Sequence, residues 1–174
     1  MKGHDRLTAE GKRFFAEMAK LARMEIQAGY PAGGKGSSAS YGPDEPTVAE
    51  VALWNEYGTY NIPSRPFLRQ TVEKNEDTMK QMAAIQLQAI ADGRQNAEGA
   101  LKNTGLLMKG MIQDTITTGS FAPNAKITVE GGWMRSKKSG KVFYVKGKNS
   151  SHPLIDTGRL RQSVNFVVKS KGGD

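Results

Sequence analysis

The tripeptide Asp156-Thr157-Gly158 is the stretch of this sequence whose residue types most directly suggest catalysis. Behind apolar residues, here residues 153–155, an Asp-Thr-Gly can supply one carboxylate of the proton-sharing pair of an aspartic protease. Three features argue against that chemistry. Arg159 would hold Asp156 ionised when the pair must retain one proton, only 18 residues follow Asp156, and the preceding 110 residues are predicted to be mostly helical.

A structural interpretation of the same residues is better supported. Asp156 or Thr157 can accept a backbone N–H at the start of a turn, and Gly158 can adopt a conformation closed to other residues. Leu160 is then expected to be buried, and Arg159 and Arg161 flank the approach to a last strand. We therefore predict a structural turn, and the protease remains a distant alternative.

The other motifs in the sequence give little evidence of catalysis or of metal or phosphate binding. The chain has no cysteine, and His4 and His152 lie in segments too distant to suggest a pair of metal ligands. The segment GGKGSS at residues 33–38 lacks the preceding strand and the glycine-to-lysine spacing of a phosphate-binding loop. Glu50 and Glu56 are explained by helix ends. The sequence predicts no metal, no cofactor and no enzyme.

Positive charge is concentrated at the C-terminal end of the chain. Residues 1–125 contain 14 Lys and Arg against 14 Asp and Glu, whereas residues 126–174 contain 11 against 3. A basic hairpin at about 126–148 can bind nucleic acid or an acidic partner, or it can be a solvated loop. The candidate contact residues are Arg135, Lys137, Lys138, Lys141, Lys146 and Lys148.

The sequence contains no apolar run of signal-peptide length at its start and none of about 20 residues that would cross a bilayer. We therefore expect the protein to be made and used in a cytosol, or released from one. A length of 174 residues predicts a single domain.

Four helices are predicted ahead of the basic region. Apolar residues at helical spacing indicate helices over residues 6–28, 47–57, 67–91 and 96–118. Thr47 and Glu50 form a capping-box pattern. Residues 31–46, rich in Gly, Ser and Pro, are predicted to be a mobile loop.

Two details concern helix packing. Pro63 and Pro66 fix the backbone ahead of Phe67, so that Phe67 is aimed in a definite direction, and Ser64 is a candidate cap for the helix that follows. Gly105 and Gly110 each cost the last long helix about 1 kcal/mol against alanine, which indicates either close packing of a neighbouring backbone or a kink.

After residue 119 the apolar period changes from that of a helix to that of a strand. Residues 127–129, 142–146 and 164–168 are predicted strands, and Ser139-Gly140 is a predicted hairpin tip. Helices first and strands last predict an α+β fold, with several helices packed on a small antiparallel sheet formed mainly by the C-terminal half.

Three motifs occur in a fixed order: VALWNEYGT at residues 51–59, IPSRPFLR at 62–69 and PLIDTGRLRQS at 153–163. Together they resemble the neck and tail-completion proteins of tailed double-stranded DNA bacteriophages. That family's pattern is an Asn-Glu-aromatic-Gly, an Ile-Pro-x-Arg-Pro-Phe and a late Asp-Thr-Gly-x-Leu-Arg-x-Ser. The loop at 31–46 and the lysine-rich segment at 134–148 fall outside this pattern.

The resemblance implies a non-enzymatic virion protein that assembles as a ring, of six copies, between the head connector and the tail tube or tail terminator. It would be located in the neck or tail of the virion, after assembly in the host cytoplasm. Packaged DNA is a further partner if the basic hairpin faces the lumen. A sequence-nonspecific DNA-binding protein is the alternative function. Residue types enriched at interfaces then suggest an assembly surface made of Trp54, Asn55, Glu56, Tyr57, Arg65, Phe67 and Arg69.

Overall fold

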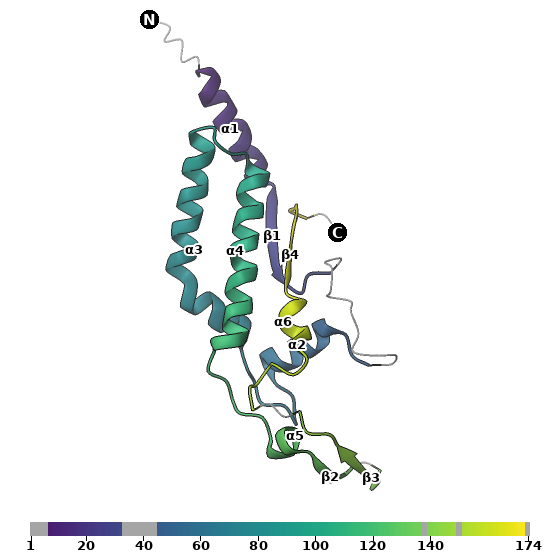
Figure 1. Cartoon of the computed structure of the whole chain (residues 1–174). Helices are drawn as coiled ribbons and strands as arrows, with labels where there is room; N and C mark the ends of the chain where they lie inside the picture. Colours follow the sequence, from purple (N-terminus) through teal and green to yellow (C-terminus); the bar gives the residue numbers. More distant parts are fainter. Residues whose placement is uncertain (1–6, 33–44, 137–138, 149–150, 173–174) are drawn as a thin grey trace, which may run out of the picture.

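A helical hairpin runs along the long axis of the molecule (Figure 1). The computed structural model describes residues 7–32, 45–136, 139–148 and 151–172. Helices α3 (Phe67–Ala91) and α4 (Ala97–Thr118) form the hairpin, and the Asn96 side chain caps α4 by accepting the Gly99 N–H at 2.8 Å. Both predicted helices are confirmed to within a residue.

The N-terminal segment differs from its prediction. Helix α1 (Ala9–Ala22) is followed at once by strand β1 (Met24–Gly29), so the predicted helix over residues 6–28 is wrong in its last part. Strand β1 pairs antiparallel with β4 (Asn165–Ser170), far away in the sequence. This long-range pairing, which runs from Met24 opposite Ser170 to Gly29 opposite Asn165, outweighs the local helical period.

The close packing of α4 on this sheet explains Gly105. A Cβ built at Gly105 would lie 2.2 Å from a ring carbon of Phe166, whereas one at Gly110 meets no atom within 4 Å. Gly105 is therefore closely packed, but by the ring of Phe166 and not by the neighbouring backbone that the sequence suggested as one explanation.

The two glycines make a matched pair for a stability measurement. We expect Gly110→Ala to raise the free energy of unfolding by about 1 kcal/mol through helix propensity. Gly105→Ala should lower it by about 1 kcal/mol, because displacing the Phe166 ring outweighs the same gain. Urea denaturation of both variants checks this, and equal stabilisation by the two would contradict the packing.

The C-terminal strands form two separate sheets among the described residues. Strand β2 (Gly132–Arg135) pairs antiparallel with β3 (Val142–Val145), apart from the β1–β4 sheet. The α+β class is confirmed, with β1 as the strand from the N-terminal part. The predicted hairpin is confirmed at its closed end, where the Ser136 N–H donates to Lys141 O at 2.8 Å.

The predicted strand at 127–129 is wrong. Residues Lys126–Glu130 form a short helix, α5, which ends at Gly131 with a positive φ of 77° and a Gly131 N–H bond to Ile127 O at 3.0 Å. Three β-branched or apolar residues are too few for periodicity to separate a strand from a helical turn. The basic hairpin is therefore built on strands β2 and β3.

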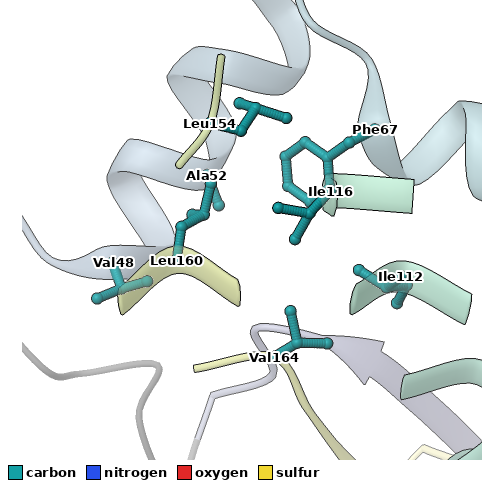
Figure 2. Packing of buried hydrophobic residues seen from close by; sticks show 8 residues of the cluster. All are labelled: Val48, Ala52, Phe67, Ile112, Ile116, Leu154, Leu160 and Val164. Atoms are coloured by element: carbon teal, nitrogen blue, oxygen red, sulfur yellow. The ribbon is translucent and has the colours of Figure 1, made fainter. Parts of the chain in front are cut away.

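The main hydrophobic core lies where helix α2 (Val48–Tyr57), the start of α3, the end of α4 and residues 154–164 meet (Figure 2). The predicted capping box of α2 is confirmed, since Thr47 and Glu50 bond each other's backbone N–H. Phe67 is fully buried in this core. The prediction that Phe67 belongs to the assembly surface is wrong for the subunit's own surface, because the segment that contains the two prolines directs Phe67 inward. The core members shown in Figure 2 are Val48, Ala52, Phe67, Ile112, Ile116, Leu154, Leu160 and Val164.

Two predicted features fall outside the described residues. Residues 33–44 of the predicted mobile loop, which include the GGKGSS segment, are among them. So are Lys137 and Lys138 of the basic hairpin.

Candidate functional site

The three sequence motifs, up to about 100 residues apart, meet around one pocket of about 340 Å³. Asn55 comes from the first motif, Arg65 from the second and the Asp156–Arg159 turn from the third. We call this the motif pocket. Its remaining lining residues are Glu45, Pro46, Val51, Asn124, Lys148, Leu154 and Leu160.

Arg65 is buried at the base of the motif pocket and bonds four oxygen atoms. Its Nε donates to Ala122 O at 2.8 Å, Nη1 to Asn55 Oδ1 at 3.1 Å, and Nη2 to Pro123 O at 3.1 Å and to Asn124 Oδ1 at 3.2 Å. Burial lowers the pKa of Arg65 from its ordinary value, although a guanidinium remains charged in proteins. The planar fork thus fastens the end of α2 to residues 122–124, the segment that leads from α4 to α5.

Asn124 and Lys148 extend this network to the third motif. Asn124 Nδ2 donates to Ser151 O at 3.3 Å and to His152 O at 3.2 Å. The Lys148 ammonium donates to His152 O at 3.4 Å and to Ile155 O at 3.2 Å. Burial lowers the pKa of Lys148, the Asp156 carboxylate opposes that shift, and the charge of Arg65 adds to it.

Lys148 was a candidate DNA or partner contact in the sequence. In the structure it bonds the chain's own carbonyl oxygens, so its ammonium is turned toward residues 152–155. Arg135, Lys141 and Lys146 are exposed, as that prediction requires.

The Asp156–Arg159 turn has the predicted structural form. Gly158 is left-handed, with φ 75° and ψ 0°, and it precedes helix α6 (Arg159–Gln162). Leu160 is buried. Of the two candidate cap residues, Thr157 makes the contact, accepting the Arg159 N–H at 3.4 Å. Asp156 is exposed, and it acts on the pocket through its charge beside Lys148.

The two arginines of this turn remain at the surface. Arg159 and Arg161 are both exposed. The backbone of α6 is fastened from both sides, since Leu160 O accepts from the Tyr30 hydroxyl at 2.8 Å and Arg161 O from Gln113 Nε2 at 3.1 Å. These backbone bonds and the burial of Leu160 hold the turn in place.

Glu56 joins the first two motifs beside the pocket. Its buried carboxylate accepts the Leu68 N–H at 2.8 Å and the Arg69 N–H at 3.1 Å, at the start of α3, and also Arg69 Nε at 3.1 Å. The N-cap residue of α3 is Pro66, which offers no side-chain hydrogen bond. The predicted cap by Ser64 is wrong, because its hydroxyl instead donates to Glu56 O at 2.9 Å.

The predicted assembly residues therefore divide into two sets. Glu56, Arg65 and Phe67 are buried within the subunit, and Asn55 is partly buried and bonded to Arg65. Trp54, Tyr57 and Arg69 are exposed, with the Arg69 guanidinium 5.5 Å from the centre of the Tyr57 ring.

Sequence reasoning missed Asn124, whose amide links Arg65 to residues 151–152. It follows a proline at the end of an irregular segment, and nothing local distinguishes it from a loop asparagine.

No family model, curated protein or solved structure matches the chain. Among residues 7–32, 45–136, 139–148 and 151–172 there is no group of three or more His, Cys, Asp or Glu side chains that could hold a metal ion. Within the same described ranges, no helix has both the length and the apolar character needed to span a membrane. The geometry of the motif pocket is that of a network which fastens separate segments together.

Proposed function

We propose that this protein is a non-enzymatic structural component of a tailed bacteriophage virion. It acts in tail completion or head-tail joining, as a ring subunit between the head connector and the tail tube or tail terminator. The observation that carries this proposal is the convergence of the three motifs on one hydrogen-bonded junction. In this chain the motif residues hold separate backbone segments in fixed positions. An assembly subunit needs such a fixed shape in order to make the same contacts with each neighbour.

The arrangement of the junction supports a joining role. Arg65 and Asn124 connect the helical body to both segments that flank the β2–β3 hairpin, residues 122–124 and 151–155. The hairpin thereby extends from a fixed base at one end of the molecule (Figure 1). A rigid body with a firmly based projection is suited to contacts between neighbouring subunits in a ring.

Electron microscopy of phage particles tests the proposed function. Particles made without this protein should accumulate as unjoined heads and tails or carry aberrant tails, and supplying the intact gene in trans should restore them. Normal, infectious particles in its absence would overturn the proposal.

The exposed basic hairpin favours one second candidate, sequence-nonspecific DNA binding. Arg135, Lys141 and Lys146 are exposed on or next to the two strands that carry the exposed rings of Trp133 and Tyr144. If three cations neutralise phosphates, log K should fall with log salt with a slope of about −3. Titration of duplex DNA at several salt concentrations measures that slope, and absence of binding at low salt would remove this candidate.

A further inference from the structure

The β2–β3 hairpin exposes apolar side chains on both of its faces. We call the two strands β2 (Gly132–Arg135) and β3 (Val142–Val145) the aromatic arm. Trp133 lies opposite Tyr144, with their ring centres 5.3 Å apart, and Met134 lies opposite Phe143 on the other face. Trp133 is 72% exposed and Tyr144 58%. A two-stranded hairpin is at best marginally stable alone in water, so this surface is suited to being covered by a partner.

A second uncovered apolar surface lies between α2 and α3. We call it the α2/α3 groove, a hollow of about 560 Å³ that includes the exposed side chains of Leu53, Tyr57 and Val72. Because the groove and the arm are both exposed in the same chain, neither covers the other within one subunit. The other residues that line the groove are Tyr30, Ala49, Ala52, Glu56, Leu68, Arg69 and Glu73.

The charges of the two surfaces are complementary. The arm and the residues up to 148 contain no Asp or Glu, and Arg135, Lys141 and Lys146 are exposed on or beside it. The groove is lined by two carboxylates, Glu56 and Glu73, against one guanidinium, that of Arg69. Since Glu56 is paired with Arg69 at 3.1 Å, the exposed carboxylate of Glu73 is left to attract an incoming cation.

We propose that the aromatic arm of one subunit packs into the α2/α3 groove of a second copy of this chain. The arm and groove are different surfaces, so each subunit offers one of each, and repetition of the contact closes a ring or extends a filament. Apolar side chains then form the centre of the interface, with the basic residues of the arm at the rim toward Glu73. This inference rests on the proposed function, because it names the contact by which the ring would form.

Disulfide cross-linking tests the contact directly, because the natural chain has no cysteine. The test variant is F143C/V72C, one cysteine on the arm and one in the groove. The matched control is F143C/L106C, since Leu106 on α4 is an exposed apolar residue like Val72, at 62% and 55% exposure. Each protein is concentrated and oxidised, multimers are resolved under non-reducing conditions, and peptide mass spectrometry locates the bond.

The test variant should give a ladder of covalent multimers joined through residues 143 and 72, in about tenfold higher yield than the control, because packing raises the effective concentration of the two thiols. Equal yields for test and control would overturn the inference. So would a chain that stays monomeric at every concentration.

A second variant tests whether the partner of the arm is another copy of the chain or DNA. M134S/F143S removes the exposed apolar pair on the hairpin face that carries residue 143, and it should abolish multimer formation while leaving duplex DNA retention unchanged. Loss of DNA retention with intact multimers would overturn the inference in favour of nucleic acid. A 143–72 bond together with normal particles in the gene deletion would sustain the contact and reject the joining role. Multimers that lack this bond, together with unjoined heads and tails in the gene deletion, would reject the contact and sustain the joining role.

Discussion

Replacing Arg65 with methionine is expected to lower the free energy of unfolding by about 4 kcal/mol. Four oxygen acceptors lose a charged donor, and hydrogen bonds to charged groups contribute about 1.5–3 kcal/mol each. Part of that loss is offset because the desolvated guanidinium is also removed. The effect should be large because the Arg65 guanidinium joins Asn55 of α2 to residues 122–124.

Arg161→Met is the matched control for this variant. Arg161 lies near the same junction but is exposed, so its loss should change the unfolding free energy by no more than about 0.5 kcal/mol. Arg65→Lys retains the charge and loses the planar fork, and should fall between the two. Urea denaturation measures all three, and a cost for Arg65→Met equal to that for Arg161→Met would contradict the network.

The same variant also tests whether the junction holds the base of the arm. In Arg65→Met, hydrogen exchange should become faster at residues 122–124 and 151–155, while the middle of α4 keeps its protection. Local loosening of this kind follows from low local stability without global unfolding. Uniform acceleration throughout the chain would indicate that Arg65 serves the core in general and not this junction.

The helices around the junction were predictable because their signals are local. The capping box at Thr47 and Glu50 indicated the start of α2, and helical spacing indicated α3 and α4. Strand β1 was not predictable in this way, since its six residues continue a helical pattern and become a strand only by pairing with β4. Helix α5 was predicted as a strand for a different reason, because its apolar run is too short to show either a helical or a strand period.

The candidate site shows the same division. The motif residues were identifiable from their order and types, and Gly158 was correctly assigned to a turn. The direction of the Phe67 side chain after the two prolines could not be predicted from the sequence. Phe67 was placed in the assembly surface, but it lies in the core. The partner of Arg65 across the chain, Asn124, depends on tertiary contacts that no local pattern contains.

Glu56→Ala is expected to lower the free energy of unfolding by about 3 kcal/mol. Its carboxylate accepts two backbone N–H groups at the start of α3, which has no side-chain cap of its own, and it also pairs with Arg69. Removing it leaves N–H donors without their buried acceptor, and the helix dipole without a nearby negative charge. Loss of the Arg69 pair adds little, because that side chain is 55% exposed.

Glu50→Ala, on the same helix, compares an exposed capping-box carboxylate with the buried carboxylate of Glu56. Glu50 also bonds backbone at a helix start, but it closes its own capping box in an exposed position, so its loss should be clearly smaller. Thermal and urea denaturation of both variants make the comparison. A larger cost for Glu50→Ala would mean that α2 alone governs stability here, whereas the expected order means that a buried carboxylate from the first motif sets the start of the helix that follows the second.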